Sequence, residues 1–150
     1  MGMPKELSST AEKGEKVVAM FAVEEKLPYG ALLFFTKQGM IKKTLLAEYA
    51  LAKASYQAIK LKEDDELLSV EVDMPDTTIL FVTQNGIGLN AEKTDIPDQG
   101  RISGGVKGMM LADGDEIVSA SQVVAGQNVT LLSDTAYAKK VNVSEIDVLA

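Results

Sequence analysis

Two sequence modules recur along this 150-residue chain, and their recurrence restricts its fold more than any other feature. Residues 61–70 (LKEDDELLSV) align without gaps on residues 111–120 (LADGDEIVSA), 50 positions further on, and residues 14–20 match part of the same module. A second module at residues 33–41 (LFFTKQGMI) recurs at 80–88 (LFVTQNGIG). Such periods indicate an array of similar supersecondary units that stack on one another.

The array contains two complete units and parts of others. A fainter copy of the second module lies at residues 131–140 (LLSDTAYAKK), with Ala136 in the position of the turn glycine. That turn must therefore differ from the others or be strained. The expected division is an N-terminal extension at residues 1–13 and an array at 14–150, with complete units at about 31–72 and 77–123 and a partial blade formed from 14–24 and 128–150.

Each unit has the pattern of short β-strands joined by tight turns. The apolar runs at 31–36, 79–83 and 129–132 read as buried strands, and Gln38-Gly39 and Asn85-Gly86 as hairpin turns. Polar strands such as 41–44 follow, then strands at 58–61 and 109–111, charged turns at 63–66 and 113–116, and last strands at 67–72 and 117–123. A short helix is predicted within 45–54, and a loop at 92–101 because Pro97 and Gly100 oppose a helix. The sequence predicts an all-β fold of propeller-like, four-stranded antiparallel blades, about three in number.

The composition excludes several classes of enzyme. The chain has no histidine and no cysteine, so it can form neither a serine–histidine or cysteine–histidine hydrolase site nor a zinc site with these ligands. We therefore expect no catalytic residues, metal or cofactor. With 46% apolar residues but no apolar run of about 20, the chain is predicted to be globular and cytoplasmic, without contact to a membrane.

The distribution of charged residues along the sequence indicates what kind of partner the chain could bind. The net charge is −7, and 14 of the 15 cations are lysines, Arg101 being the exception. The cations recur around the hairpins and the glycine-rich loop, whereas carboxylates concentrate in the charged turns. If units lie side by side, a basic edge separates from an acidic one, although solvated polar turns explain the pattern equally well. The candidate phosphate-binding residues are Lys37, Lys42, Lys43, Lys53, Arg101, Lys107, Lys139 and Lys140.

The glycine-rich segment at 100–108 (GRISGGVKG) suggests a phosphate loop only superficially. A Walker loop ends in Gly-Lys-Ser/Thr before a helix, whereas Lys107 is followed by glycine and a β-like run. A tight crossover between strands is the favoured interpretation, although its backbone N–H groups beside Arg101 could bind a phosphodiester. The paired carboxylates Asp64/Asp65 and Asp113/Asp115 lack the ligand pattern of an EF-hand and are expected to be solvated turns.

Several of these motifs resemble one known family. Residues 37–44 (KQGMIKKT), followed by 46–49 (LAEY), are similar to a repeat signature of the C-terminal domains of the DNA gyrase and topoisomerase IV A subunits. Residues 61–68 (LKEDDELL) and 95–108 (DIPDQGRISGGVKG) resemble the same family in the same order. The resemblance covers roughly residues 14–149.

The resemblance implies a β-pinwheel, a ring of four-stranded blades that exchange strands with their neighbours. It also implies a non-catalytic role: a basic outer rim holds and wraps double-stranded DNA through its phosphates, without base specificity. The implied partners are the rest of the topoisomerase A subunit, which contains the catalytic tyrosine, and the ATPase B subunit.

The sequence departs from the family pattern in ways that weaken this expectation. The basic heptapeptide Gln-Arg-Arg-Gly-Gly-Lys-Gly of gyrases is absent, and Asn90-Ala91 replaces a cation common in relatives. The alternative function is a pinwheel-like scaffold that binds proteins instead of DNA. Open strand edges in a partial ring suggest either that Lys16–Val23 pairs with Val129–Val143 or that two chains form a homodimer.

Overall fold

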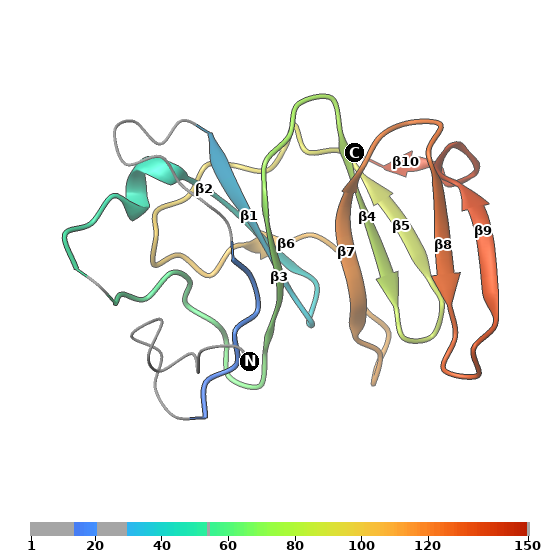
Figure 1. Cartoon of the computed structure of the whole chain (residues 1–150), viewed down its shortest axis with the longest axis horizontal. Helices are drawn as coiled ribbons and strands as arrows, with labels where there is room; N and C mark the ends of the chain where they lie inside the picture. Colours follow the sequence, from blue (N-terminus) through green and yellow to red (C-terminus); the bar gives the residue numbers. More distant parts are fainter. Residues whose placement is uncertain (1–13, 21–29, 54, 150) are drawn as a thin grey trace, which may run out of the picture.

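The computed structural model describes residues 14–20, 30–53 and 55–149, and the expected N-terminal extension at 1–13 lies outside them. Within these ranges the regular structure is β-strand apart from two 3₁₀ turns, η1 (Leu46–Tyr49) and η2 (Val143–Glu145). The strands form two four-stranded sheets and one two-stranded hairpin, which follow one another across the molecule (Figure 1). The all-β prediction is confirmed.

The first sheet has the strand order β3-β1-β2-β6. Its members are β1 (Ala31–Thr36), β2 (Met40–Leu45), β3 (Leu67–Val72) and β6 (Val106–Lys107). The second sheet has the order β10-β5-β4-β7. Its members are β4 (Thr78–Thr83), β5 (Gly88–Ala91), β7 (Ile117–Val123) and β10 (Val148–Leu149). The third sheet is the hairpin of β8 (Asn128–Leu132) and β9 (Ala138–Asn142).

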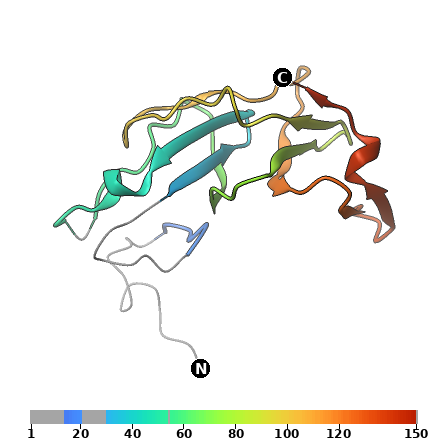
Figure 2. The same cartoon turned by 90° about the horizontal axis from the view of Figure 1, so that it is seen from above.

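Strand exchange links the two larger sheets. β6 belongs to the second repeat unit in sequence, but it pairs antiparallel with β2 of the first, through Met40↔Lys107 and Ile41↔Val106. The chain thus crosses between sheets, and in Figure 2 the segment before β6 passes along the first sheet. The implied pinwheel exchange of strands is present in this array.

The core lies between the first two sheets. Alternate residues of β1, Leu33 and Phe35, are fully buried against Ile79 and Phe81 of β4. The rings of Phe35 and Phe81 meet edge to face with centroids 6.0 Å apart. Leu32 and Phe34, which alternate with these residues, pack on Leu46 and Ile59 at the opposite face of the first sheet. One face of the first hairpin therefore packs on the second sheet, and the other packs on residues of its own unit.

Some predicted elements are misplaced. The strands expected at 58–61 and 109–111 do not form; pairing occurs instead at Val106–Lys107, which is the part of that unit that reaches the neighbouring hairpin. The helix predicted within 45–54 is only the single 3₁₀ turn η1. Residues 92–101 form a loop with a single isolated bridge, at Asp98, close to the prediction.

The third blade is not completed by the N-terminal segment. Residues 14–20 form no strand, and both views place them beside the first sheet, across the molecule from β8 and β9 (Figures 1 and 2). The proposed pairing of Lys16–Val23 with Val129–Val143 is therefore wrong for residues 16–20, and residues 21–24 lie outside the described ranges.

Ala136, at the turn between β8 and β9, adopts φ = 64°, so that turn is strained as expected.

No helix in the described ranges is long and apolar enough to cross a membrane.

Candidate nucleic-acid interface

Lys42 is buried and cannot serve as a surface cation. Its side chain lies on β2 opposite Phe34 and has no exposed surface. Its ammonium donates hydrogen bonds to the carbonyls of Ala58, at 2.7 Å, and of Arg101, and to the Tyr49 hydroxyl at 3.3 Å. The prediction that Lys42 contacts phosphate is thus corrected, because neighbouring segments cover it and use its three donors.

The surroundings of Lys42 lower its basicity. Burial, and next the positive charge of Arg101, lower the pKa of Lys42 from 10.5 to about 8, while Glu48 opposes the change. The faces of the Phe34 and Tyr49 rings, with centroids 4.9 and 5.9 Å from the ammonium, compensate part of the lost hydration.

A shallow pocket of about 500 Å³ brings together two of the candidate cations, Lys53 and Arg101. The guanidinium of Arg101 lies over the Tyr56 ring, 5.6 Å from its centroid, and donates to the Gln57 carbonyl. Lys53 is exposed at the same pocket. The remaining lining residues are Leu51, Ala52, Ser55 and Ile102. No carboxylate of the described residues lines this pocket, so an anion can approach both cations.

The glycine-rich loop is the tight crossover that the sequence favoured. Gly105 has φ = 87°, and a Cβ at this position would lie 2.5 Å from the Ile41 carbonyl oxygen. Within the loop, the N–H of Ser103 donates a hydrogen bond to the Gly100 carbonyl, and the N–H of Gly105 donates one to the Ser103 hydroxyl. These two N–H groups are therefore not free for a phosphate, and the loop presents the Arg101 side chain instead.

Lys37 lies among carboxylates. Its ammonium is 3.1 Å from Glu66, and the hydrogen bond to Glu66 with the nearby charge of Glu116 raises the pKa of Lys37. A second pocket, of about 370 Å³, is lined by Lys37 together with Asp64, Glu66, Asp115 and Glu116. The expected separation of a basic from an acidic edge is wrong here, because β3 runs antiparallel to β1 and brings its acidic turn beside the β1–β2 hairpin.

The recurring aspartates cap the hairpin turns. Asp65 Oδ1 accepts from the N–H groups of Gln38, at 3.0 Å, and Glu66, at 2.8 Å. Asp115 repeats this arrangement with Asn85, at 3.2 Å, and Glu116, at 3.0 Å. Asp65 is buried, so the expectation of a purely solvated turn is wrong for it. Among the described residues, no group of three or more potential ligands is arranged to hold a metal.

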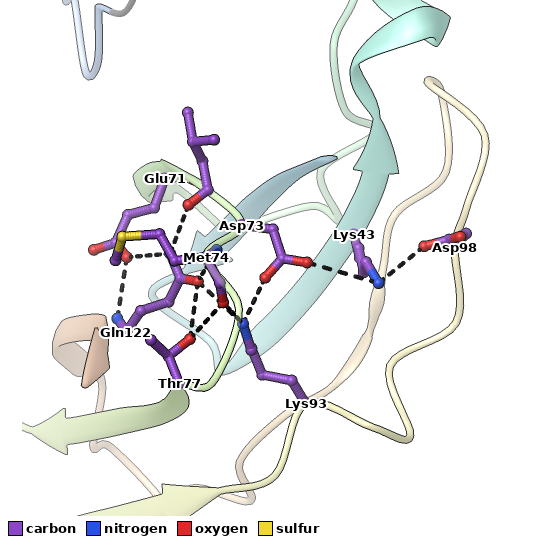
Figure 3. Close-up of polar contacts among 9 residues, drawn as sticks. Lys43, Glu71, Asp73, Met74, Thr77, Lys93, Asp98 and Gln122 are labelled. Atoms are coloured by element: carbon purple, nitrogen blue, oxygen red, sulfur yellow. Dashed lines mark hydrogen bonds and ion pairs between the residues drawn. The ribbon is translucent and has the colours of Figure 1, made fainter. Parts of the chain in front are cut away.

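Lys43 is neutralised by two carboxylates. Its ammonium lies 3.7 Å from Asp73 and 3.3 Å from Asp98 (Figure 3). Lys93 binds the other oxygen of Asp73 at 2.6 Å. Lys43 lies on β2 and Asp73 directly follows β3 of the first sheet, whereas Lys93 and Asp98 belong to the second unit, so these ion pairs join the two blades.

Gln122 extends this junction between blades, as Figure 3 also shows. Its side-chain amide donates to Glu71, at 3.0 Å, and to the Val72 carbonyl, at 2.8 Å. Its side-chain oxygen accepts from the Met74 N–H, at 2.8 Å, and from Lys93, at 3.3 Å. A buried, fully used amide of this kind fixes the angle at which two blades meet.

The remaining candidates lie on separate strands. Lys107 is exposed on the outer strand β6, and Lys139 and Lys140 are exposed on β9. Lys139 lies opposite Leu131 across the third hairpin, and Lys42 lies opposite Phe34 across the first. Lys139 and Lys42 therefore occupy equivalent positions in the repeat. The structure thus brings Lys53 and Arg101 into one pocket, whereas Lys37 and Lys43 are occupied by carboxylates.

Sequence reasoning missed several residues of this region. Tyr56 and Gln57, which support the Arg101 side chain, have no distinguishing pattern. Glu71 and Gln122 likewise belong to no motif that the repeat singles out. The capping role of Asp65 and Asp115 could have been predicted from the sequence, since these aspartates recur 50 positions apart beside a predicted hairpin.

Comparison with known proteins identifies the family. A model described as DNA gyrase C-terminal domain, beta-propeller, matches residues 31–72 and 77–123. The chain belongs to this family. Among solved structures, the C-terminal domain of DNA topoisomerase IV superposes with a TM-score of 0.90 at 27% identity, over 99% of this chain and 47% of that one. The DNA gyrase A C-terminal domain superposes with a TM-score of 0.72 at 27% identity, over 83% of this chain and 41% of that one.

The curated relatives are likewise named as A subunits of DNA topoisomerase IV and DNA gyrase. The DNA topoisomerase 4 A subunit from Bacillus subtilis is 32% identical over 92% of this chain and 17% of its own length. The DNA gyrase A subunit from Metamycoplasma arthritidis is 34% identical over 87% of this chain and 15% of its length. This gyrase-family chain thus spans about one sixth of such subunits and less than half of the two solved C-terminal domains.

Proposed function

We propose that this domain binds double-stranded DNA in the cytoplasm through the phosphate backbone, as a non-catalytic part of a type IIA topoisomerase A subunit. The observation that carries the proposal is the carboxylate-free pocket where Lys53 and Arg101 lie together. Arg101 supplies a planar guanidinium suited to a phosphate, and Lys53 supplies a second, mobile charge. Lys107, on the outer strand of the first sheet, adds an exposed cation.

Binding of this kind is electrostatic and independent of base sequence. Lysine and arginine side chains that neutralise phosphates release the counterions condensed on the DNA, so affinity falls steeply with salt. The acidic turns, where Lys37 lies beside Glu66, repel the duplex and restrict it to the other surfaces. With a net charge of −7, we expect weak binding.

In the whole protein, the domain would hold a curved DNA segment near the catalytic core of the A subunit, which works together with the ATPase B subunit. The rigid junction between the first two blades supports this role, because bending DNA needs contact points at fixed relative positions.

The proposal is tested by DNA affinity at ~50 mM salt, where electrostatic binding is strong. Fluorescence anisotropy with a duplex of ~150 base pairs, about one persistence length, compares the wild type with two double variants. The variant Lys53→Glu/Arg101→Glu should lose most of the affinity. The control Lys37→Glu/Lys62→Glu has the same net charge and should retain it. Equal losses in both variants would show that only net charge matters and remove the pocket from the proposal.

A second candidate function is supported by the exposed β8–β9 hairpin. Leu132 and Tyr137 on this hairpin are 75% and 79% exposed, and Ile87, in the turn between β4 and β5, is 56% exposed. Apolar surface next to open strand edges favours pairing with protein, either another part of the same topoisomerase or a second copy of this chain. Sedimentation velocity tests the homodimer: Leu132→Lys/Tyr137→Lys should shift a dimer to monomer.

A further inference from the structure

We propose that Lys42 is a positioning residue that holds the Arg101 loop in place for the phosphate backbone. This inference rests on the proposed function. Nothing in the repeat motif itself assigns this role, because the motif presents Lys42 and Lys43 as a pair of equivalent cations.

The ammonium of Lys42 connects two segments that are distant in sequence. It donates to the carbonyl of Ala58 at 2.7 Å and to the carbonyl of Arg101, 16 and 59 positions away along the chain. The Tyr49 hydroxyl, which binds the same Ala58 carbonyl at 3.0 Å, also accepts from Lys42. A single side chain on the rigid strand β2 thus fixes the backbone of Arg101 itself.

The side chain of Arg101 contacts the same segment, around Ala58, that Lys42 binds. Its guanidinium donates to the Gln57 carbonyl and lies over Tyr56, adjacent to the Ala58 carbonyl that Lys42 binds. The backbone of Arg101 is therefore held by Lys42, and its side chain by the segment that Lys42 also holds. Loss of Lys42 would release both supports together.

Within the described ranges, only limited backbone contact joins the two segments besides Lys42. The Lys60 N–H donates to the Ser103 carbonyl at 3.2 Å. Without the ammonium, the carbonyls of Ala58 and Arg101 lose a charged donor, and exposure to water becomes their favourable alternative. We therefore expect the loop to open and the guanidinium to leave its place at the pocket.

The repeat supplies an internal comparison. In the second unit Leu89 pairs with Phe81, in the position that Lys42 takes opposite Phe34. The buried ammonium is thus not required to form a hairpin of this fold. Its presence in the first unit coincides with the loop that presents Arg101.

The charged and titratable groups that face Lys42 are Glu48, Tyr49 and Arg101. The positive charge of Arg101 opposes that of Lys42, whereas Glu48 favours it. A shared electrostatic environment of this kind predicts that the effects of changing Lys42 and Arg101 on DNA binding are not additive.

The test combines a measurement without DNA and a double-mutant cycle with DNA. Hydrogen exchange compares residues 56–61 and 100–105 in the wild type, Lys42→Met and the control Lys107→Met. We expect faster exchange in these segments only in Lys42→Met, with β1 and β4 unchanged. DNA affinity should fall about tenfold in Lys42→Met, the value of one charge-assisted contact, but should not fall further when Arg101→Met is already present.

Each outcome decides between the two proposals. Faster exchange in a protein whose wild type does not bind DNA supports the positioning role and overturns the proposed function. Unchanged exchange, or the same loss of affinity with and without Arg101→Met, overturns the positioning role while DNA binding by the wild type stands. If Lys42→Met fails to fold, Lys42→Gln, which keeps a side-chain donor, is compared in the same two backgrounds and read by the same criteria.

Discussion

The ammonium of Lys42 lies 4.9 Å from the centroid of Phe34, the residue that it faces across β1 and β2. The sequence presents this lysine as part of a basic hairpin, but the fold encloses it between aromatic rings and loop carbonyls. The basic character of the motif is therefore divided between a structural cation, Lys42, and an ion-paired one, Lys43.

The first prediction concerns the pH dependence of stability. Because the pKa of Lys42 is lowered to about 8 from 10.5, the unfolded chain binds more protons than the folded chain between these values. Stability contributed by Lys42 therefore rises as the pH increases through this window. Urea denaturation at pH 7 and pH 9.5 should show the free energy of unfolding of the wild type rising relative to Lys42→Met. Above pH 10 ionisation of Tyr49 opposes this trend, because burial raises its pKa.

The control for this titration is Lys62→Met, which removes an exposed lysine beside the acidic turn. Its difference from the wild type should not follow the same pH course. A constant difference between the wild type and Lys42→Met from pH 7 to 9.5 would contradict a lowered pKa at this site.

The second prediction concerns the strained turn of the third hairpin. Ala136 has φ = 64°, whereas glycine occupies the equivalent positions, Gly39 with φ = 78° and Gly86 with φ = 82°. Because a left-handed conformation costs a non-glycine residue roughly 1 kcal/mol, Ala136→Gly should stabilise this hairpin by about that amount. The comparison is Ala138→Gly, which places glycine within β9 and should destabilise it by about 0.5–1 kcal/mol. Local hydrogen exchange in β8 and β9 measures both effects, and a destabilising Ala136→Gly would refute the assignment of strain.

Much of the fold could be predicted because the same pattern of strands occurs in both repeat units, so that each unit supports the strand positions assigned in the other. The edge strands β3 and β7 have the expected boundaries, 67–72 and 117–123, since their apolar patterns coincide at an offset of 50. The outer strand β6 could not be located in the same way. Its position at Val106–Lys107 depends on the register with the neighbouring hairpin, in which the paired residues are 65 and 67 positions apart.

The candidate site was less predictable because local sequence does not report long-range acceptors. Nothing near Lys42 indicates that the Arg101 carbonyl lies within its reach. The position of Lys37 beside Glu66 did have a signal, because antiparallel pairing of β1 with β3 necessarily brings the hairpin next to the acidic turn. The sequence interpretation grouped like turns and overlooked this consequence of strand direction.

The third prediction concerns the junction between blades. The Gln122 amide donates to Glu71 at 3.0 Å, within a network that also includes Ser121 and Met74. Removal of one partner leaves the other without its donor or acceptor, so a double-mutant cycle of Glu71→Ala and Gln122→Ala should give an interaction energy of about 1–3 kcal/mol. Urea denaturation measures it. The cycle of Glu63→Gln with Gln122→Ala should be additive, since Glu63 lies in the acidic turn and is exposed.

The fourth prediction concerns the balance of charge around Lys43. The carboxylates of Asp73 and Asp98 lie 3.7 and 3.3 Å from its ammonium, and the exposed fraction of the Asp98 side chain is 53%. Phosphate competes poorly with two fixed carboxylates, so Lys43→Met should change DNA affinity by less than about twofold. Asp98→Asn should increase affinity and steepen its salt dependence, because it removes a negative charge and partly frees Lys43.

Glu63→Gln is the matched control for that increase, as it removes the same charge from the acidic turn. Anisotropy titrations at several salt concentrations separate a local from a global effect of charge. A steeper salt dependence in Asp98→Asn alone would place Lys43 beside the bound duplex. An equal increase in both variants would mean that the duplex responds only to net charge, and Lys43 would then serve solely in the ion pairs that join the blades.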